Sequence, residues 1–311
     1  MINKNIKILV TGGNGMLGSE VVKVLNKNKL YKIYAPSSKE MNLLNFNLAK
    51  KFFLKIQPDY FLMIAGKVGG IKDNSLKKYE YLNENLQMII NAFRCLEIQK
   101  TNKAIFVGSS CIYPKNITRK INEKDLLKGE LEPTNEGYAL AKISGLKLSE
   151  YFSLKHKIPI ICPMFTNIYG SNDNFDLETS HVLSALVRRF VEAKKYNKKE
   201  VVIWGSGKPK REFIHVYDAA RAIVFLLKNC NNYELINVGS GDELTIKNLA
   251  KLIASEVGFN GKILFDKKMP DGMLRKRLDL SKIKKMGFKN KISLKKGIKM
   301  TIRDYKKKLS S

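Results

Sequence analysis

Apolar residues occur along the chain in two alternating patterns. Short, nearly uninterrupted apolar runs predict buried strands, at residues 6–11, 32–35, 60–64, 104–107 and 158–164. Stretches in which apolar residues recur every three or four positions predict helices, at residues 48–56, 83–100 and 138–149. Strands that alternate with helices are typical of a parallel sheet covered on both faces. The pattern therefore predicts the α/β class, with a doubly wound parallel sheet.

The alternation loosens after about residue 170. The remaining pattern predicts helices at 182–194, 217–227 and 246–257, and extended segments at 201–204, 211–216 and 237–241. No linker rich in proline or serine and no internal repeat separates this part from the first. We expect a sheet domain over residues 1–170 and a smaller lobe over 171–311 that interleaves with it, with a ligand in the cleft between them.

A glycine-rich turn, T-G-G-N-G-M-L-G, follows the first predicted strand and leads into a helix. Gly12, Gly15 and Gly18 have the spacing that allows a tight turn, close approach of a pyrophosphate, and close packing of helix on strand. Met16 and Leu17 complete the turn. In this context the motif predicts a Rossmann-type dinucleotide site, and the alternative is a purely structural turn.

The residues after the second strand bear on which dinucleotide binds. An acidic residue there would bind the ribose 2'-hydroxyl of NAD, whereas hydroxyls and a cation suit the 2'-phosphate of NADP. Ser37, Ser38 and Lys39 follow Pro36 in this chain, with no acidic residue at the end of the strand. The sequence therefore favours NADP over NAD.

The stretch from Gly108 to Lys142 carries candidate chemistry for a carbonyl group. Ser109 lies just past a buried strand, where ligands bind in open α/β sheets. Tyr138 and Lys142, at i and i+4 of a predicted helix, lie on one face. A cation beside a phenol favours the phenolate, so we expect Lys142 to lower the pKa of Tyr138 and make it a usable proton donor. Taken alone, the pair is compatible with an ordinary amphipathic turn.

Composition excludes several classes of function. The 57 Lys and Arg residues exceed the 28 Asp and Glu residues, giving a formal charge of +29 that by itself suggests nucleic acid or an anionic membrane. The lysines are, however, spread along the whole chain, and no RNA-binding signature or zinc-ligand spacing is present. No apolar run approaches the roughly 20 residues that span a bilayer, and no signal peptide is evident. We expect no nucleic-acid partner, no membrane association and no metal.

The four cysteines, Cys95, Cys111, Cys162 and Cys230, are far apart and form no C-x-x-C pair. This usage predicts neither a disulfide framework nor a zinc site, and it fits a reducing, cytoplasmic location.

The glycine turn together with Ser109, Tyr138 and Lys142 resembles the extended short-chain dehydrogenase/reductases. Further segments narrow the resemblance to the GDP-L-fucose synthase family, and they read A-G-K-V-G-G-I, G-S-S-C-I-Y-P, L-E-P-T-N-E-x-Y-A-x-A-K, T-N-I-Y-G, D-N-F with S-H-V, W-G-S-G-x-P-x-R-E-F-I-H-V and P-D-G-x-x-R-K. These matches run from about Ile8 to about Leu294. The resemblance implies an enzyme that epimerises and then reduces a GDP-4-keto-6-deoxy sugar with NADPH, making an activated sugar for surface polysaccharide.

The resemblance also implies roles for single residues. Ser109, Tyr138 and Lys142 match the reductive triad of the family, and Cys111 and His181 match its epimerisation base and acid. Asn167, in the T-N-I-Y-G segment, matches a further residue that binds the cofactor. The positions at which the family holds its GDP-sugar are Arg189, Trp204, Arg211, Asp271 and Lys276. Structural roles are the alternative for Cys111 and His181, and we interpret His156 and His215 as structural. Family members are commonly homodimers, which we expect here by analogy.

Three departures from the family pattern leave the cofactor and the sugar less defined. Asn14 and the turn 36–38 replace arginines of some members, and Ser184 replaces a proline after S-H-V. One alternative is a C4 ketoreductase only, acting on a related GDP-4-keto-hexose or GDP-4-keto-heptose. Another is a non-catalytic NADP-binding sensor, which would not need Ser109, Tyr138 and Lys142 together.

Overall fold

The computed structural model describes residues 5–269 and 271–310. Its strands are β1 (Ile6–Thr11), β2 (Tyr31–Tyr34), β3 (Tyr60–Met63), β4 (Lys103–Phe106), β5 (Gly108–Ser109), β6 (Ile160–Phe165), β7 (Asn167–Tyr169), β8 (Glu200–Trp204), β9 (Lys210–His215), β10 (Glu234–Val238), β11 (Glu243–Thr245) and β12 (Lys262–Asp266). Its α-helices are α1 (Met16–Leu25), α2 (Phe46–Ile56), α3 (Ile71–Leu76), α4 (Lys78–Ile98), α5 (Glu136–His156), α6 (Val182–Lys195), α7 (Val216–Asn229), α8 (Ile246–Val257), α9 (Ser281–Lys285) and α10 (Leu294–Lys308).

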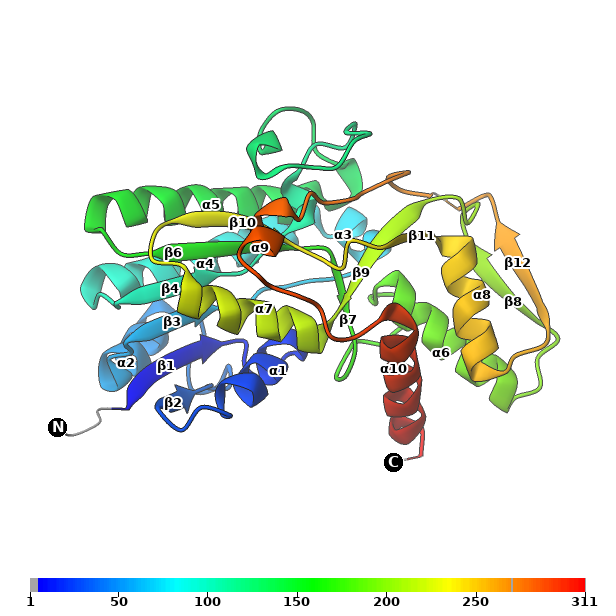
Figure 1. Cartoon of the computed structure of the whole chain (residues 1–311), viewed down its shortest axis with the longest axis horizontal. Helices are drawn as coiled ribbons and strands as arrows, with labels where there is room; N and C mark the ends of the chain where they lie inside the picture. Colours follow the sequence, from blue (N-terminus) through cyan, green and yellow to red (C-terminus); the bar gives the residue numbers. More distant parts are fainter. Residues whose placement is uncertain (1–4, 270, 311) are drawn as a thin grey trace.

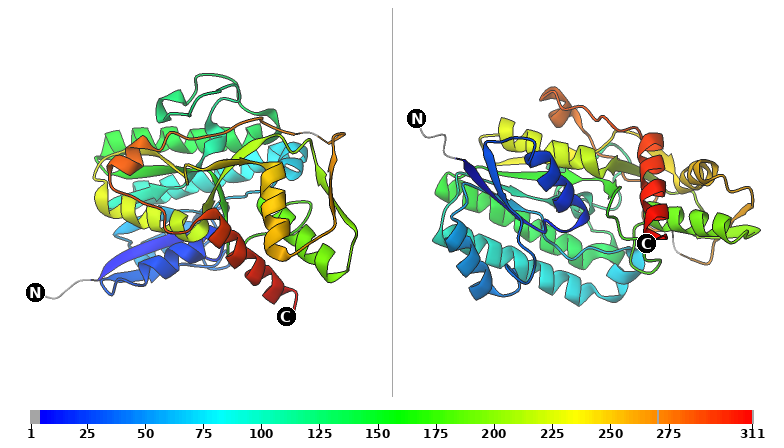
Figure 2. Two further views of the ribbon diagram at one scale, coloured as in Figure 1. Left: turned by 45° about the vertical axis from the view of Figure 1, so that its right-hand side comes forward. Right: turned by 90° about the horizontal axis from the view of Figure 1, so that it is seen from below.

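A parallel sheet of order β10-β6-β4-β3-β1-β2 forms the larger part of the molecule, with β5 paired to β6. Helices α1 and α7 cover one face, and α2, α4 and α5 cover the other (Figures 1 and 2). The strand order reverses between β1 and β3, and ligands bind outside the carboxyl ends of strands at such a point. The predicted α/β class and doubly wound parallel sheet are confirmed.

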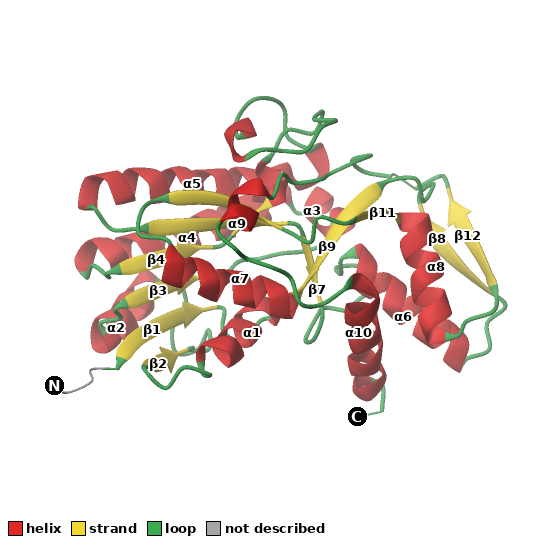
Figure 3. Cartoon of the chain, viewed as in Figure 1, coloured by secondary structure: helices red, strands yellow, loops and turns green. Residues whose placement is uncertain are grey.

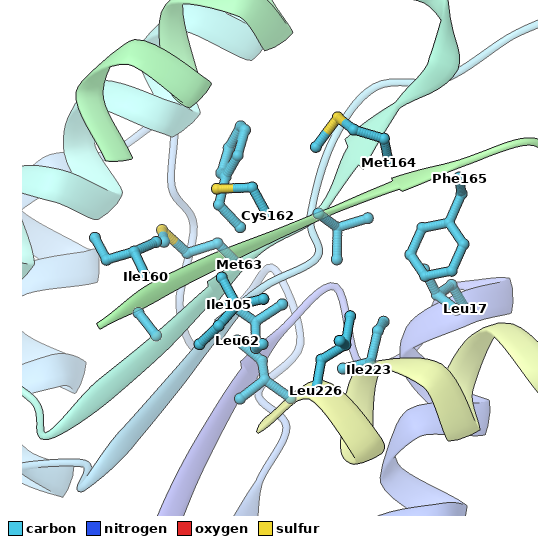
Figure 4. Close-up of a cluster of buried hydrophobic side chains, with 14 of the residues drawn as sticks. Leu17, Leu62, Met63, Ile105, Ile160, Cys162, Met164, Phe165, Ile223 and Leu226 are labelled. Carbon is cyan, nitrogen blue, oxygen red and sulfur yellow. The ribbon is translucent and has the colours of Figure 1, made fainter. Parts of the chain in front are cut away.

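The sheet is held by a core of aliphatic side chains that the apolar runs of the sequence supply. Leu62 of β3 and Ile105 of β4 meet Ile223 and Leu226 of α7 on one face of the sheet (Figure 4). Ile160 of β6 points to the opposite face. Central parallel strands are covered on both faces, which is why these segments show no polar alternation. The sheet therefore offers a rigid support for the loops at its carboxyl edge.

A smaller lobe carries β7, β9 and β11 in one sheet and β8 and β12 in another, together with α6, α8 and α10 (Figure 3). A second apolar core joins these helices, with Val187 and Phe190 of α6, Leu249 of α8 and Ile298 of α10 fully buried. Between the pieces of the lobe the chain returns to the large sheet as α7 and β10. The division into residues 1–170 and 171–311 stays a prediction.

Within the described residues, no helix is both long and apolar enough to cross a membrane. That same part of the chain holds no group of three or more His, Cys, Asp or Glu side chains suited to a metal ion.

Candidate active site

A cavity of about 770 Å³ opens where the carboxyl ends of the large sheet face the smaller lobe. Both parts line it, and most of the predicted site residues do so: Gly12, Gly15, Met16, Leu17, Gly18, Ser109, Cys111, Tyr138, Lys142, Asn167, His181, Arg189, Trp204, Arg211, Asp271 and Lys276. The turn of Ser37, Ser38 and Lys39 does not line this cavity. Pro270, which begins the P-D-G segment, lies outside the described residues. The fold thus brings the candidate residues together, and their roles stay predictions.

The glycine turn has the shape of a diphosphate cradle. Gly12 has a φ of +73°, and a Cβ on Gly18 would lie 2.0 Å from the carbonyl oxygen of Gly12, so a side chain at either position would strain the turn. Gly15 is the N-cap of α1 with no side chain to cap it, and a Cβ there would meet only the Gly12 carbonyl oxygen at 3.3 Å. The helix end therefore keeps backbone N–H groups and open space for an anion.

The turn after β2 contains a carboxylate that the sequence analysis did not consider. Glu40 accepts hydrogen bonds from the backbone N–H and the hydroxyl of Ser37, each at 2.9 Å. These bonds hold the pKa of Glu40 below its usual range. Ser38 and Lys39 are exposed beside it. A 2'-phosphate bound at this turn would face the Lys39 cation and also the Glu40 anion.

Ser109 and Cys111 lie at the end of β5 and in the short turn that follows it. Ser109 pairs with Phe165 of β6. Gly108 before it leaves room for the Met164 side chain, whose methyl carbon would lie 1.9 Å from a Cβ at this position. The hydroxyl of Ser109 caps a 3₁₀ turn over residues 110–112 and accepts from the Cys111 N–H at 3.3 Å. Burial raises the pKa of the Cys111 thiol, and the charge of Lys276, the Ser109 hydroxyl and the charge of Lys142 oppose that rise.

Tyr138 and Lys142 lie on the first two turns of α5. Gly145 lets this helix approach the sheet, since a Cβ there would lie 2.2 Å from the Phe106 ring. The Lys142 ammonium consequently reaches the Val107 carbonyl and donates to it at 2.8 Å. Burial lowers the pKa of Lys142 to about 8. Burial raises the pKa of Tyr138, and Cys111 and Tyr81 raise it further, so the expected lowering by Lys142 does not occur.

His181 is the N-cap residue of α6, and its side chain makes no capping hydrogen bond. Burial lowers the pKa of His181, and the negative charge of Asp173 opposes this. Asp173 is itself buried, and Ser184 on α6 donates a hydrogen bond to it. Sequence reasoning missed Asp173, although the D-N-F segment that contains it was part of the family pattern.

The residues expected at the GDP-sugar lie on the lobe side of the cavity. Arg189 donates to the Val202 carbonyl at 2.8 Å, and its guanidinium carbon lies 5.7 Å from the centre of the Trp204 ring. Asp271 accepts from the N–H and the hydroxyl of Ser206, both at 2.6 Å. Asp271 is thus already hydrogen-bonded to the loop that follows β8, whereas the Trp204 ring remains partly exposed at the cavity.

Other lining residues were not anticipated. Lys72 lies over the Trp204 ring, 6.0 Å from its centre, and pairs with Glu178. Lys72 belongs to α3, whose six residues are too few to show a helical period in the sequence. Glu132 lines the cavity near Arg211 and Lys276, and its position in L-E-P-T-N-E was the available signal.

The two remaining histidines have structural surroundings. His215 is buried, caps α7 by accepting from the Tyr217 N–H at 3.2 Å, and packs edge-on against Tyr169. His156 ends α5 and contacts Glu97 of α4 at 3.0 Å. Neither lines the cavity.

Comparison with known proteins shows which family shares this sequence and fold. Residues 8–239 match the model of the NAD dependent epimerase/dehydratase family. The chain is 45% identical over 305 residues to a putative GDP-L-fucose synthase 2 of Arabidopsis thaliana (98% of this chain, 93% of that protein). It is 38% identical over 302 residues to the GDP-L-colitose synthase of Yersinia pseudotuberculosis (95% and 96%).

A solved structure extends the likeness to the fold. The GDP-mannoheptose C4 reductase of Campylobacter jejuni, with NADP bound, is 32% identical and superposes with a TM-score of 0.88 over 98% of this chain and 99% of that one. The chain belongs to the NAD dependent epimerase/dehydratase family and, within it, to the proteins related to GDP-L-fucose synthases.

Proposed function

We propose that the protein is an NADPH-dependent epimerase and reductase of a GDP-4-keto-6-deoxy sugar. The observation that carries the proposal is that Cys111 and His181 line the same cavity as Ser109, Tyr138 and Lys142. A reductase needs only the last three, so the extra thiol and imidazole are explained by a second proton-transfer reaction on the same sugar. The GDP-L-fucose and GDP-L-colitose synthases among the relatives support the substrate class.

The glycine turn is suited to the diphosphate of the cofactor, with the N–H groups at the start of α1 as donors. Asn167, which donates to the Glu212 carbonyl at 2.9 Å, borders the cavity beyond β6. When bound, NADPH supplies the hydride for the ketone carbon. The solved relative with NADP bound supports this cofactor, and we propose that Ser37, Ser38 and Lys39 face its 2'-phosphate.

In the reduction, the hydroxyls of Ser109 and Tyr138 donate hydrogen bonds to the C4 carbonyl oxygen. Tyr138 gives its proton to that oxygen as negative charge develops there, and the Lys142 ammonium stabilises the phenolate that remains. Lys142 is fixed for this role by its hydrogen bond to the Val107 carbonyl. The three residues come from two rigid elements, the end of the sheet and the start of α5.

In the epimerisation, the C4 ketone makes the protons on C3 and C5 acidic because their removal gives an enolate. Cys111 removes the proton as a thiolate, and His181 delivers a proton to the other face of the carbon. Burial raises the pKa of Cys111, and the charges of Lys276 and Lys142 oppose that rise and so favour the thiolate. Tyr138 donates to the enolate oxygen, so it serves both half-reactions.

The GDP moiety lies on the lobe. Arg189, Arg211 and Lys276 supply cations for the diphosphate, because guanidinium groups bind phosphate oxygens in pairs. Trp204 supplies a flat apolar surface at the cavity wall, and Asp271 is an acceptor beside it. The positive side chains of the lobe thus balance the negative charge of the substrate diphosphate.

The test is incubation with GDP-4-keto-6-deoxy-mannose. With NADPH, we expect a fall in NADPH absorbance and a product epimerised at C3 and C5. In deuterated water without NADPH, we expect deuterium to enter C3 and C5. No NADPH oxidation with any of a panel of GDP-4-keto sugars would contradict the proposal and favour the non-catalytic sensor.

A second candidate is a C4 ketoreductase that receives a sugar already epimerised. The likeness to the GDP-mannoheptose C4 reductase favours it. The two candidates differ in one outcome, because a reductase alone would oxidise NADPH but incorporate no deuterium at C3 or C5. Either product would be an activated sugar for surface polysaccharide.

We also propose a cytoplasmic homodimer. Apolar residues lie exposed along one side of α5, at Leu140, Leu148, Tyr151 and Leu154, and Ile90 and Ile98 lie exposed on the neighbouring α4. Such a two-helix surface fits a second copy of itself across a two-fold axis. All four cysteines are free, which supports a reducing compartment. Sedimentation of the wild type beside Leu148→Glu and Tyr151→Glu tests the dimer.

A further inference from the structure

Unpaired polar atoms are concentrated around the cavity of the active site. Within the described residues, five buried side-chain atoms that can hydrogen-bond have no partner. Four of them belong to residues that line the cavity: Asn74 Oδ1, Asn135 Oδ1, Thr166 Oγ1 and Ser180 Oγ. Buried polar atoms are almost always hydrogen-bonded, because leaving one unpaired costs free energy. We therefore expect polar atoms of this kind at a cavity wall to pair with what the cavity binds.

Asn135 differs from an ordinary asparagine at the start of a helix. An asparagine in the N-cap position normally accepts a hydrogen bond from a backbone N–H of the first turn. Asn135 is the N-cap residue of α5, yet its side chain makes no capping hydrogen bond. The 3₁₀ turn Pro133–Asn135 runs directly into α5, so Asn135 has a φ of −125° and a ψ of 18° and lacks the extended backbone of a capping residue. The helix that Asn135 begins therefore leaves its amide unused.

The backbone that carries Asn135 is fixed by its surroundings. Glu132 accepts a hydrogen bond from the Thr134 N–H at 3.2 Å and another from the Thr134 hydroxyl, and these bonds hold the 3₁₀ turn. A Cβ on Gly137 would lie 2.4 Å from the Lys78 carbonyl oxygen, so the beginning of α5 packs closely against the beginning of α4. A rigid support of this kind is what a side chain needs if it is to select one ligand.

The position of Asn135 relates its amide to one atom of the sugar. Asn135 lies three positions before Tyr138, residues at i and i+3 are neighbours on a helix surface, and both line the cavity together with Ser109. In the proposed reduction Ser109 and Tyr138 bind the C4 oxygen, so the Asn135 oxygen lies on the part of the wall beside C4. Of the two ring carbons next to C4 in a 6-deoxy sugar, C5 carries a methyl group and C3 carries a hydroxyl. The hydroxyl on C3 is therefore the donor that this acceptor can use.

We propose that Asn135 accepts a hydrogen bond from the C3 hydroxyl of the sugar and so selects substrates that carry this hydroxyl. The proposal rests on the proposed function and narrows its substrate class to 4-keto sugars with a hydroxyl on C3. A 3-deoxy sugar would leave the Asn135 oxygen buried and unpaired. A site built to bind a hydroxyl rejects the analogue that lacks it for this reason.

The first experiment compares GDP-4-keto-6-deoxy-mannose with its 3-deoxy analogue. With NADPH, kcat/KM of the wild type should be at least about tenfold higher for the parent sugar, the effect of one hydrogen bond between uncharged groups. In Asn135→Ala, kcat/KM for the parent should fall by about tenfold while that for the analogue stays close to the wild-type value. An equal loss for both sugars would overturn the proposal, because it would show a general effect on Tyr138 or on α5. Unchanged values for both sugars would overturn it as well.

The matched control is Asn45→Ala. Asn45 is the N-cap residue of α2, accepts a hydrogen bond from the Leu48 N–H at 3.0 Å, and does not line the cavity. Its replacement should lower Tm by about two degrees, because a helix cap is lost, and should leave the preference between the two sugars unchanged. Asn135→Ala should show the reverse, a lost preference with a Tm close to that of the wild type.

The second experiment measures binding without turnover. Both sugars are titrated by calorimetry into the full-length protein with NADP⁺, which has no hydride to transfer. The wild type should bind the parent about tenfold more tightly than the 3-deoxy analogue, and the two Kd values should converge in Asn135→Ala. Equal Kd values in the wild type would overturn the proposal.

Asn135→Leu takes the place of the alanine variant if circular dichroism shows that the latter does not fold. Leucine has a similar branched shape without polar atoms, so a preference retained in Asn135→Leu would overturn the proposal in the same way. A wild type that reduces no GDP-4-keto sugar contradicts the proposed function instead, and the comparison of Kd values then decides the role of Asn135 separately.

Discussion

The Lys142 ammonium lies 5.7 Å from the centre of the Tyr138 ring and gives its hydrogen bond to the Val107 carbonyl. Residues at i and i+4 of α5 do share one face, as the helical spacing predicts. They do not form a direct hydrogen bond, and burial keeps the pKa of Tyr138 above its usual range. Lys142 therefore acts on Tyr138 through its electric field, which matters most when negative charge forms on the phenol oxygen.

This arrangement predicts the pH dependence of the reduction. Burial lowers the pKa of Lys142 to about 8, so the ammonium is charged below that pH and neutral above it. We expect kcat/KM for NADPH-dependent reduction of a pre-epimerised substrate to fall as pH rises through about 8. In Lys142→Met the rate should be low at every pH and the fall should disappear. A wild-type profile that stays flat from pH 7 to 9 would show that the charge of Lys142 is not required.

Cys111→Ser and Tyr138→Phe should separate the two half-reactions. The serine hydroxyl is too weak an acid to replace a thiolate, so Cys111→Ser should lose deuterium exchange at C3 and C5 yet still reduce an already epimerised sugar. Tyr138→Phe should lose about 10²-fold or more in reduction and also slow exchange, because it removes the donor to the oxygen in both steps. Normal exchange and turnover in Cys111→Ser would leave the reductase-only function in place of the bifunctional one.

Lys276 should have a second role beside substrate binding. Its charge opposes the rise that burial causes in the pKa of Cys111. In Lys276→Met, the pH at which iodoacetamide reacts half-maximally with Cys111 should therefore shift upward. The reaction at the other cysteines is subtracted with Cys111→Ser. Lys72→Met, which removes another lysine of the cavity, is the matched control and should leave the alkylation profile unchanged.

Glu40 should weaken the binding of NADPH. Its pKa is held low by the hydrogen bonds from Ser37, so it is ionised at neutral pH and would repel a 2'-phosphate at this turn. In Glu40→Gln we expect the Kd for NADPH to fall several-fold, because the substitution removes a negative charge that would repel the 2'-phosphate. NADH, which lacks the 2'-phosphate, is the internal control. A parallel change for both cofactors would point to an altered turn and not to charge.

The sequence predicted the elements whose pattern is local. The apolar run 6–11 and the glycine turn gave β1 and the start of α1, because both depend on neighbouring residues alone. Strand β12 was missed, because it is partly exposed and its partner β8 lies far from it in the sequence. Pairing between distant segments changes the local sequence pattern of either segment very little, so it cannot be predicted from that pattern.

The site divides in the same way. Motif spacing was enough to predict that Ser109, Tyr138 and Lys142 lie together, because short motifs on rigid elements have few geometries available. The three residues do line one cavity. Two electrostatic features did not follow from spacing. The direction of the Tyr138 pKa depends on its burial, and the partnership of Asp173 with Ser184 depends on how a loop folds back on α6. Burial and loop contacts are properties of the whole fold.

The return of the chain to the large sheet as β10 has a consequence for synthesis on the ribosome. β6 pairs with β10, whose residues lie about seventy positions later in the chain, after α6, β8, β9 and α7. Until those residues have been translated, one side of β6 is an unpaired strand edge, the kind of surface through which nascent chains associate. The order of the segments thus sets a period during which a growing chain must be kept from its neighbours.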